Sequence, residues 1–185
     1  MATLGLDIST SCTGWCVIDH KESHEVLVDL GYISLQKLSS SYSKAMEVAR
    51  VLKEIKRSHS ITKICIEENL QAFRPGLSSA KTLLTLARFN GVVSYLVQEE
   101  FCISPEFINV NTARKSLGIK IKRSKDGGAP TKNQVHDWVS SQISESYPWP
   151  TKRLKSGPRK GKEVYEPACF DMSDAYVIAR AGQII

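Results

Sequence analysis

The sequence predicts an α/β fold, in which a five-stranded mixed sheet is flanked by helices. Short apolar runs with the length of strands alternate with longer segments whose apolar residues recur at helical spacing. The first three strands follow one another through short connections, which favours an antiparallel arrangement. Helices separate the later strands, as in a mixed sheet. The strands are expected at residues 3–8, 15–19, 25–35, 63–67 and 107–110.

The helices are predicted from apolar periodicity and from hydroxyl residues that can cap a helix start. Ser41 or Ser43 is expected to cap the first helix, and Thr131 the third. Four of the seven prolines lie in residues 145–168, which are therefore expected to form an irregular loop. The helices are expected at about residues 41–59, 78–100, about 132–144 and 172–181.

The composition indicates one domain spanning residues 1–185, since 185 residues with 42% hydrophobic content suit a single core. No apolar run is long enough to cross a membrane, and the acidic residue at position 7 argues against a signal peptide. The five cysteines form no CxxC pair, so reduced cysteines of an intracellular protein are expected, with a zinc site as the alternative. The compartment is expected to be the cytoplasm of a bacterium or an infected host cell, or an organelle.

Positive charge is concentrated in one stretch of the chain. The net charge is +6, and residues 114–163 hold 13 Lys or Arg against 4 Asp or Glu. The remaining residues hold 12 Lys or Arg against 15 Asp or Glu. This asymmetry favours a polyanionic partner, while a solvated basic loop remains the alternative.

Four acidic residues are the candidate catalytic and metal-binding groups. Asp7 lies within an apolar strand, Glu67 ends another, and Asp171 and Asp174 share one face of the last helix. A carboxylate in an apolar strand is costly unless it is paired or binds a cation, and few Lys or Arg are expected around these four. Hard oxygen ligands suit Mg²⁺ or Mn²⁺, and two such ions can promote phosphodiester hydrolysis.

Each acid also has an ordinary interpretation. Asp7 could hold a phosphate-bearing ligand through Mg²⁺, as in actin-like ATPases. Glu67 could be a surface residue at a strand end, with Glu68 beside it as a competing candidate. Asp171 could be a helix cap or a first-turn charge that favours the helix dipole.

Three blocks of the sequence resemble the motifs of RuvC-type Holliday junction resolvases, which belong to the ribonuclease H-like superfamily. Residues 4–18 hold a strand Asp, a turn of small residues, then Gly and an aromatic residue; residues 64–67 read Ile-Cys-Ile-Glu; residues 171–179 begin Asp-Met-Ser-Asp-Ala. The resemblance covers almost the whole chain, and the small size and a basic insertion at about 147–168 would suit a phage, viral or organellar member. It implies a ribonuclease H-like fold and a homodimer that cuts four-way DNA junctions, leaving 3′-hydroxyl and 5′-phosphate ends. It also implies four metal ligands, which are Asp7, Glu67, Asp171 and Asp174.

The resemblance also implies DNA contacts outside the four acids. Lys132 corresponds to a lysine that approaches the phosphate and stabilises transition-state charge. Some members carry an aromatic residue that stacks at the junction core; here Phe73 is the candidate, while Leu70 stands nearer the expected place. The helix at 78–100 resembles a dimer-forming helix, with intramolecular packing as the alternative. The further DNA-binding candidates in these segments are Arg74, Arg114, Lys115, Lys120, Lys122 and Arg123.

Residues at about 147–168 depart from the compact bacterial members of that family and resemble a basic insertion. We expect this insertion to hold a DNA arm through its phosphates. Its candidate DNA-binding residues are Lys152, Arg153, Lys155, Arg159 and Lys160. The alternative functions are ribonuclease H-like cleavage of RNA–DNA hybrids, a non-catalytic module that binds branched DNA, and an actin-like kinase or ATPase.

Overall fold

The computed structural model describes residues 1–21, 24–68 and 79–185 of the chain. Its main sheet has five strands in the order β3-β2-β1-β4-β5, which confirms the predicted number. The predicted DNA contacts Leu70, Phe73 and Arg74 lie outside the described residues. The strands are β1 Ala2–Ile8, β2 Cys12–Lys21, β3 His24–Ser34, β4 Ile61–Glu67 and β5 Glu106–Ile108.

The sheet is mixed, as the sequence predicts. Strands β1, β2 and β3 form an antiparallel meander, whereas β4 pairs in parallel with both β1 and β5. The two parallel pairs require crossover connections, which the helices between them supply. The carboxyl ends of β1 and β4 therefore meet at one edge of the sheet.

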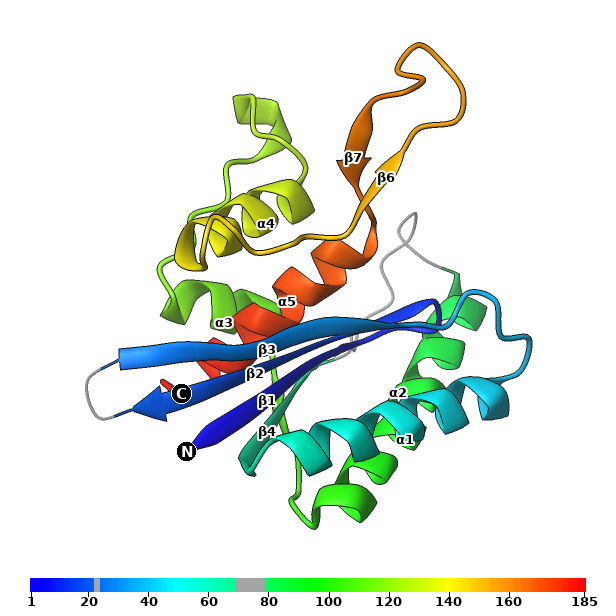
Figure 1. Ribbon diagram of the computed structural model, residues 1–185, viewed down its shortest axis with the longest axis vertical. Helices are drawn as coiled ribbons and strands as arrows, with labels where there is room; N and C mark the ends of the chain where they lie inside the picture. Colours follow the sequence, from blue (N-terminus) through cyan, green and yellow to red (C-terminus); the bar gives the residue numbers. More distant parts are fainter. Residues whose placement is uncertain (22–23, 69–78) are drawn as a thin grey trace.

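Helices cover both faces of the sheet and give three layers (Figure 1). One face carries α1 (Ser41–Ser58) and α2 (Ala80–Phe101), and the other carries α3 (Val110–Ser116), α4 (Thr131–Gln142) and α5 (Ala168–Ala181). Each face has its own apolar core. Alternation along the strands divides the side chains between the two cores, so Leu4, Leu6 and Ile8 face α1 and α2 while Cys65 faces α5.

Several predicted boundaries are corrected. Strand β5 ends at Ile108, and residues 110–116 form α3, a short helix that the sequence analysis did not predict. Ser40, rather than Ser41 or Ser43, caps α1, because its hydroxyl accepts from the Ser43 amide while Ser43 bonds back to Ser40. Thr131 is the first residue of α4 and not its cap.

The loop expected at 145–168 contains regular structure. Strands β6 (Thr151–Arg153) and β7 (Glu163–Tyr165) pair in antiparallel fashion and form a projecting hairpin (Figure 1). Helix α5 begins at Ala168, earlier than the predicted residue 172, so Asp171 lies inside its first turn. Alternation over three residues is too short to predict such strands from a basic, proline-rich segment.

All five cysteines are free, and Cys102 alone among them is exposed. Within the part of the chain that the structure describes, none of the helices combines the length and apolar character needed to cross a membrane.

Candidate active site

Two of the predicted acids lie side by side at the edge of the sheet. Leu6 of β1 is in register with Ile66 of β4, so Asp7 and Glu67 follow at neighbouring strand ends. Leu6 and Ile66 both belong to the core under α1 and α2. Because side chains alternate along a strand, Asp7 and Glu67 both face α5.

Helix α5 brings the other two acids to this edge because it lies directly on the backbone of β1 and β2. A Cβ added at Gly14, which is opposite Asp7 in β2, would be 2.1 Å from the carbonyl oxygen of Asp171. A Cβ at Gly5 would be 2.4 Å from the carbonyl oxygen of Ala175. Any larger residue at these positions would push α5 away and carry Asp171 from the sheet.

The four carboxyl groups interact electrostatically, and all four have raised pKa values. Burial raises the pKa of Asp7 most, followed by repulsion from Glu67, Asp174 and Asp171. Burial, then Asp174 and Asp171, raises the pKa of Glu67 to about 7. Burial is also the main reason that the pKa values of Asp171 and Asp174 are raised. The structure thus brings together four acids that are costly to ionise without added positive charge.

Arg114 of α3 corrects the expectation that few cations surround these acids. Its Nη2 donates to Oδ1 of Asp174 at 3.0 Å, and both side chains are largely buried. Its Nε is buried without a hydrogen-bond partner among the described residues. Arg114 is predicted from the sequence to contact DNA, and its contact with Asp174 depends on α3, a helix that the sequence pattern does not predict.

Two more side chains reach Asp171. The thiol of Cys12, at the start of β2, hydrogen-bonds to the Asp171 carboxylate, and burial and this carboxylate raise the pKa of the thiol. Lys132 of α4 lies with Nζ 4.7 Å from the centre of the Phe170 ring, and its charge lowers the pKa of Asp171 in part. Lys132 therefore lies beside the acids, whereas nothing in the sequence pointed to Cys12.

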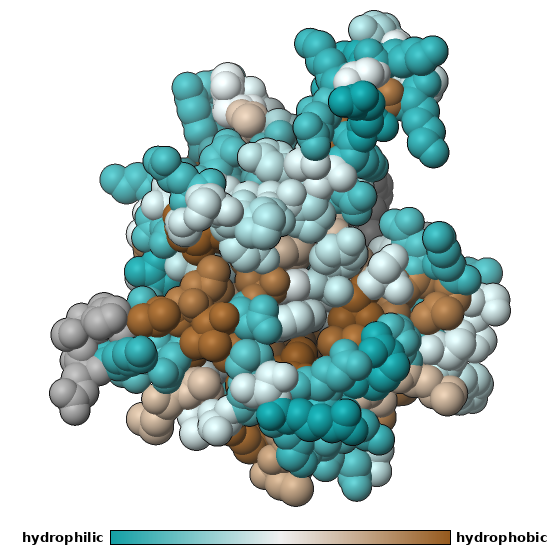
Figure 2. Space-filling model, viewed as in Figure 1, coloured by the Kyte–Doolittle hydropathy of each residue, from teal (hydrophilic) through white to brown (hydrophobic). Residues whose placement is uncertain are grey.

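Apart from Lys115, which is exposed on α3, the remaining basic candidates that the structure describes are exposed in two projecting segments. One segment connects α3 with α4, and the other is the hairpin; both extend on the α5 side of the sheet (Figure 1). Figure 2 shows hydrophilic side chains over the hairpin. The exposed candidates are Lys115, Lys120, Lys122, Arg123, Lys152, Arg153, Lys155, Arg159 and Lys160.

An aromatic cluster around His136 holds the base of the hairpin against α4 and α5. The His136 ring is buried and makes edge contacts with Trp149 and Tyr165, at centroid distances of 4.5 and 4.6 Å. Its Nδ1 lies 2.9 Å from the Ser173 hydroxyl, which itself donates to the Cys169 carbonyl. His136 therefore donates from Nδ1 and connects the hairpin to the helix that carries Asp171 and Asp174.

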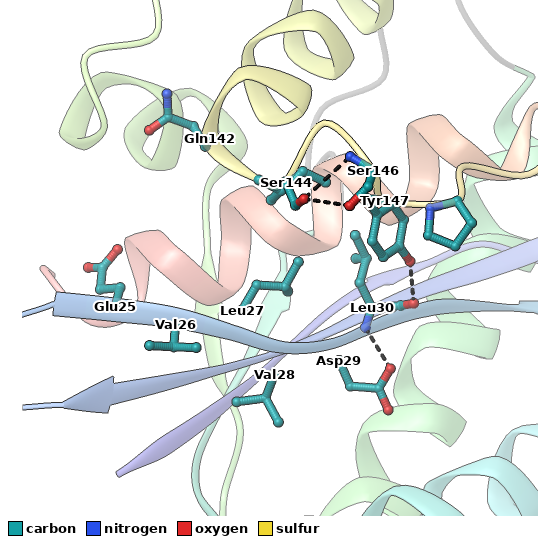
Figure 3. Close-up of a pocket in the computed structure, with 12 residues that line it drawn as sticks. Glu25, Val26, Leu27, Val28, Asp29, Leu30, Gln142, Ser144, Ser146 and Tyr147 are labelled. Atoms are coloured by element: carbon teal, nitrogen blue, oxygen red, sulfur yellow. Dashed lines mark hydrogen bonds between the residues drawn. The ribbon is translucent and has the colours of Figure 1, made fainter.

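A cavity of about 550 Å³ lies elsewhere, between β3 and the segment after α4 (Figure 3). Its lining includes Leu27 and Leu30, above which the Tyr147 hydroxyl donates to the Leu30 carbonyl at 2.7 Å. Apolar side chains gather over β3 in Figure 2. None of the four acids lines this cavity, so it is separate from the candidate active site.

Comparisons with known proteins agree with this geometry. The family model for crossover junction endodeoxyribonuclease RuvC matches residues 3–141, which include Asp7, Glu67 and Lys132 and end before the hairpin. The chain is 26% identical over 136 residues to the RuvC protein of Aliarcobacter butzleri, covering 73% of this chain and 79% of that relative.

Two solved structures show the same fold. The structure of Thermus thermophilus RuvC in complex with a Holliday junction substrate has a TM-score of 0.65 and 14% identity, covering 98% of this chain and 92% of that one. The yeast mitochondrial Holliday junction resolvase has a TM-score of 0.58 and 15% identity, covering 97% and 76%. The expected ribonuclease H-like fold is confirmed.

Proposed function

Because the chain belongs to the RuvC family of crossover junction endodeoxyribonucleases, we propose that it resolves four-way DNA junctions by phosphodiester hydrolysis. The observation that carries the proposal is the convergence of Asp7, Glu67, Asp171 and Asp174 from three elements onto one edge of the sheet. Water would attack phosphorus and the bond to the 3′ oxygen would break, which leaves 3′-hydroxyl and 5′-phosphate ends.

The family is one of metal-dependent nucleases, and the acid cluster fits divalent cations. Four carboxylates with raised pKa values supply the hard oxygen donors that Mg²⁺ and Mn²⁺ prefer. Among the described residues, no three His, Cys, Asp or Glu side chains are arranged to hold a metal ion as they stand, so the fit rests on the donor chemistry of the four acids. We propose that Asp7, Glu67, Asp171 and Asp174 hold two Mg²⁺ ions, which when bound activate water and stabilise the leaving oxygen.

The neighbouring cations have separate proposed roles. Arg114 orients the Asp174 carboxylate through its 3.0 Å hydrogen bond. Lys132 is exposed beside Asp171 and would stabilise the negative charge that develops on the phosphate. The exposed basic residues of the hairpin and of the α3–α4 connection would hold the DNA backbone.

The direct test of this function uses a synthetic four-way junction with Mg²⁺, with the nicks mapped on each strand. We expect paired nicks at symmetric positions in two opposed strands, and no cleavage in EDTA. An RNA–DNA hybrid and a linear duplex of the same sequence serve as comparison substrates. Faster cleavage of the hybrid than of the junction would contradict the proposal and support ribonuclease H-like activity instead.

A homodimer is proposed because a two-fold junction calls for a two-fold enzyme, and because three large apolar residues of α2 are exposed. Leu84, Val92 and Tyr95 are 59, 45 and 64% exposed and lie on one side of the helix. Gly91 lies on the same side, and a Cβ added there would meet nothing within 4 Å, so this side of α2 is open to a partner.

Replacing Val92 with Asp is therefore expected to weaken the dimer by about tenfold or more, because a charge would be buried among apolar groups. Analytical ultracentrifugation over a concentration series measures the change. Ile184→Asp is the matched control, since Ile184 is a similarly exposed apolar residue outside α2. A dimer of unchanged strength in V92D would remove α2 from the interface.

If the hairpin binds DNA phosphates, it should contribute to the salt dependence of junction affinity. Changing Lys155, Arg159 and Lys160 together to Gln should lower the slope of log affinity against log salt by about 2 to 3, since each neutralised phosphate contributes roughly 0.9. Titration of a labelled junction between 50 and 300 mM salt measures the slope. The matched control neutralises the exposed Lys21, Lys53 and Arg57, which lie outside the hairpin. An equal slope for the hairpin variant and the wild type would mean that the hairpin makes no phosphate contacts.

A further inference from the structure

A cavity of about 260 Å³ lies at the start of α5 and adjoins the acid cluster. Its walls come from the ends of β2 and β3, from β6 of the hairpin and from the start of α5. Asp171 lines it, so the cavity opens directly beside a proposed metal ligand. Its other polar walls include Tyr32, Ser34, Gln36, Lys152 and Glu166. We call it the Tyr32 cavity.

The sheet sets the position of Tyr32 relative to Asp7. Asp7 is in register with Gly14, and Gly14 is in register with Tyr32, so the three residues form a row across β1, β2 and β3. Paired residues of neighbouring strands place their side chains on the same face. With strands about 4.8 Å apart, the Cα atoms of Asp7 and Tyr32 are about 10 Å apart on the α5 face. That distance suits a nucleotide next to the phosphate that is cut.

The chemistry of the cavity favours a base over a phosphate. Tyr32 is 36% exposed, and aromatic side chains of this kind stack on unpaired bases. Glu166 faces it closely enough that, after burial, its charge is the main reason the pKa of Tyr32 is raised. A carboxylate repels phosphate but accepts hydrogen bonds from the amino groups of bases.

The cavity walls are held in place by backbone contacts. The amide of Glu166 donates to the carbonyl of Pro150 at 2.9 Å, which joins the start of α5 to the base of the hairpin. The thiol of Cys169 donates to the same carbonyl at 3.1 Å. Pockets for drug-sized ligands usually measure roughly 300 to 1,000 Å³, so a volume of about 260 Å³ suits a smaller flat group.

We propose that the Tyr32 cavity receives the unpaired base of a nucleotide that flanks the cleaved phosphate. Tyr32 stacks on this base, and Glu166 accepts from an exocyclic amino group, so adenine, cytosine and guanine are favoured over thymine. Lys152 of β6 lies at the hairpin side of the cavity, where it would contact the backbone of the DNA strand between the hairpin and the acids. The inference rests on the proposed junction cleavage and adds a determinant of where the strand is cut.

The experiment measures initial nicking rates, at saturating Mg²⁺, on four-way junctions that carry each of the four bases at the positions on either side of the nick. The wild type is expected to cut about tenfold more slowly with thymine at one of these positions. Glu166→Gln should reduce this preference to less than about threefold, because an amide both donates and accepts. Glu145→Gln removes an equivalent charge from an exposed position outside the cavity and should keep the wild-type preference.

Tyr32 is tested by a pair of substitutions. Tyr32→Phe keeps the flat ring and Tyr32→Leu removes it, so Y32L should cut every junction several-fold more slowly than Y32F. With 2-aminopurine at the favoured position, binding in Ca²⁺ should quench its fluorescence in the wild type and in Y32F but not in Y32L. Thermal unfolding of each variant checks that it is folded.

The outcomes separate the two proposals. If the wild type nicks junctions but E166Q keeps its base preference, or Y32L quenches 2-aminopurine as the wild type does, the cavity proposal is overturned while the function stands. If the wild type nicks no junction under any condition, the proposed function fails and the cavity proposal fails with it.

Discussion

Replacing Asp7 with Asn is expected to lower Mg²⁺-dependent nicking of a four-way junction by a factor on the order of 10³. Asp7 is the most enclosed of the four acids, and its carboxyl interacts with the other three. An amide of the same shape keeps the packing but removes the charge that a divalent cation requires. Junction affinity measured in Ca²⁺ should stay within about twofold, because the basic residues that hold the DNA are unchanged.

The matched control for D7N is Asp19→Asn. Asp19 also lies in the sheet, but it is paired in register with Ala2 at the opposite end of β1, and its carboxylate binds the amino terminus at 3.0 Å. D19N should therefore cut at the wild-type rate. Nicking by D7N at a tenth of the wild-type rate or more would show that Asp7 is not needed for catalysis, and the four-acid site would have to be abandoned.

The sheet was predictable from the sequence because its order follows from local patterns. Short connections between the first three strands produce a meander. Two segments with apolar residues at helical spacing, which form α1 and α2, precede the parallel strands β4 and β5. The same patterns placed Asp7 and Glu67 at strand ends, and their register puts them side by side. Asp171 joins them because Gly14 leaves room for α5, a consequence of packing that the position of a single glycine in the sequence does not reveal.

Arg114 and the Tyr32 cavity were beyond prediction for a physical reason. Arg114 belongs to a seven-residue helix, which is too short to show a convincing apolar period. Tyr32 and Glu166 are 134 positions apart in the sequence and meet only because α5 crosses the sheet beside β3. Contacts of this kind depend on how layers stack, whereas the sequence pattern reports mainly which face of each element is buried.

A second large effect is expected on stability. In EDTA, the protein should become less stable as the pH rises from about 4.5 to about 7, because the pKa of Glu67 is raised from 4.5 to about 7 in the folded state. A carboxyl with a raised folded pKa binds more protons when folded, so its favourable contribution is present at low pH and is lost as the group ionises. A shift of this size corresponds to at most about 3 kcal/mol. The raised pKa values of Asp7, Asp171 and Asp174 act in the same direction.

Urea unfolding at pH 5.5 and at pH 8, with EDTA or with 10 mM Mg²⁺, measures this effect. Mg²⁺ should stabilise the protein at pH 8 far more than at pH 5.5, because a cation binds the ionised cluster and not the protonated one. The difference in stability between the two pH values should be the same for D19N as for the wild type, since the amino terminus lowers the pKa of Asp19 and this carboxyl stays ionised at both. Equal stabilisation by Mg²⁺ at both pH values would mean that the ion binds somewhere other than the four acids.

The two predictions meet in the D7N protein, which should lose cleavage and yet gain stability. In EDTA at pH 8, removing one of four repelling charges should raise the free energy of unfolding above that of the wild type, and the response to Mg²⁺ should shrink. A purely structural Asp7, satisfied by neighbouring groups, would give the opposite sign, because its replacement would leave those groups unpaired. The sign of the change in the free energy of unfolding caused by D7N therefore distinguishes an acid that binds a cation from an acid that stabilises the fold, without any measurement of cleavage.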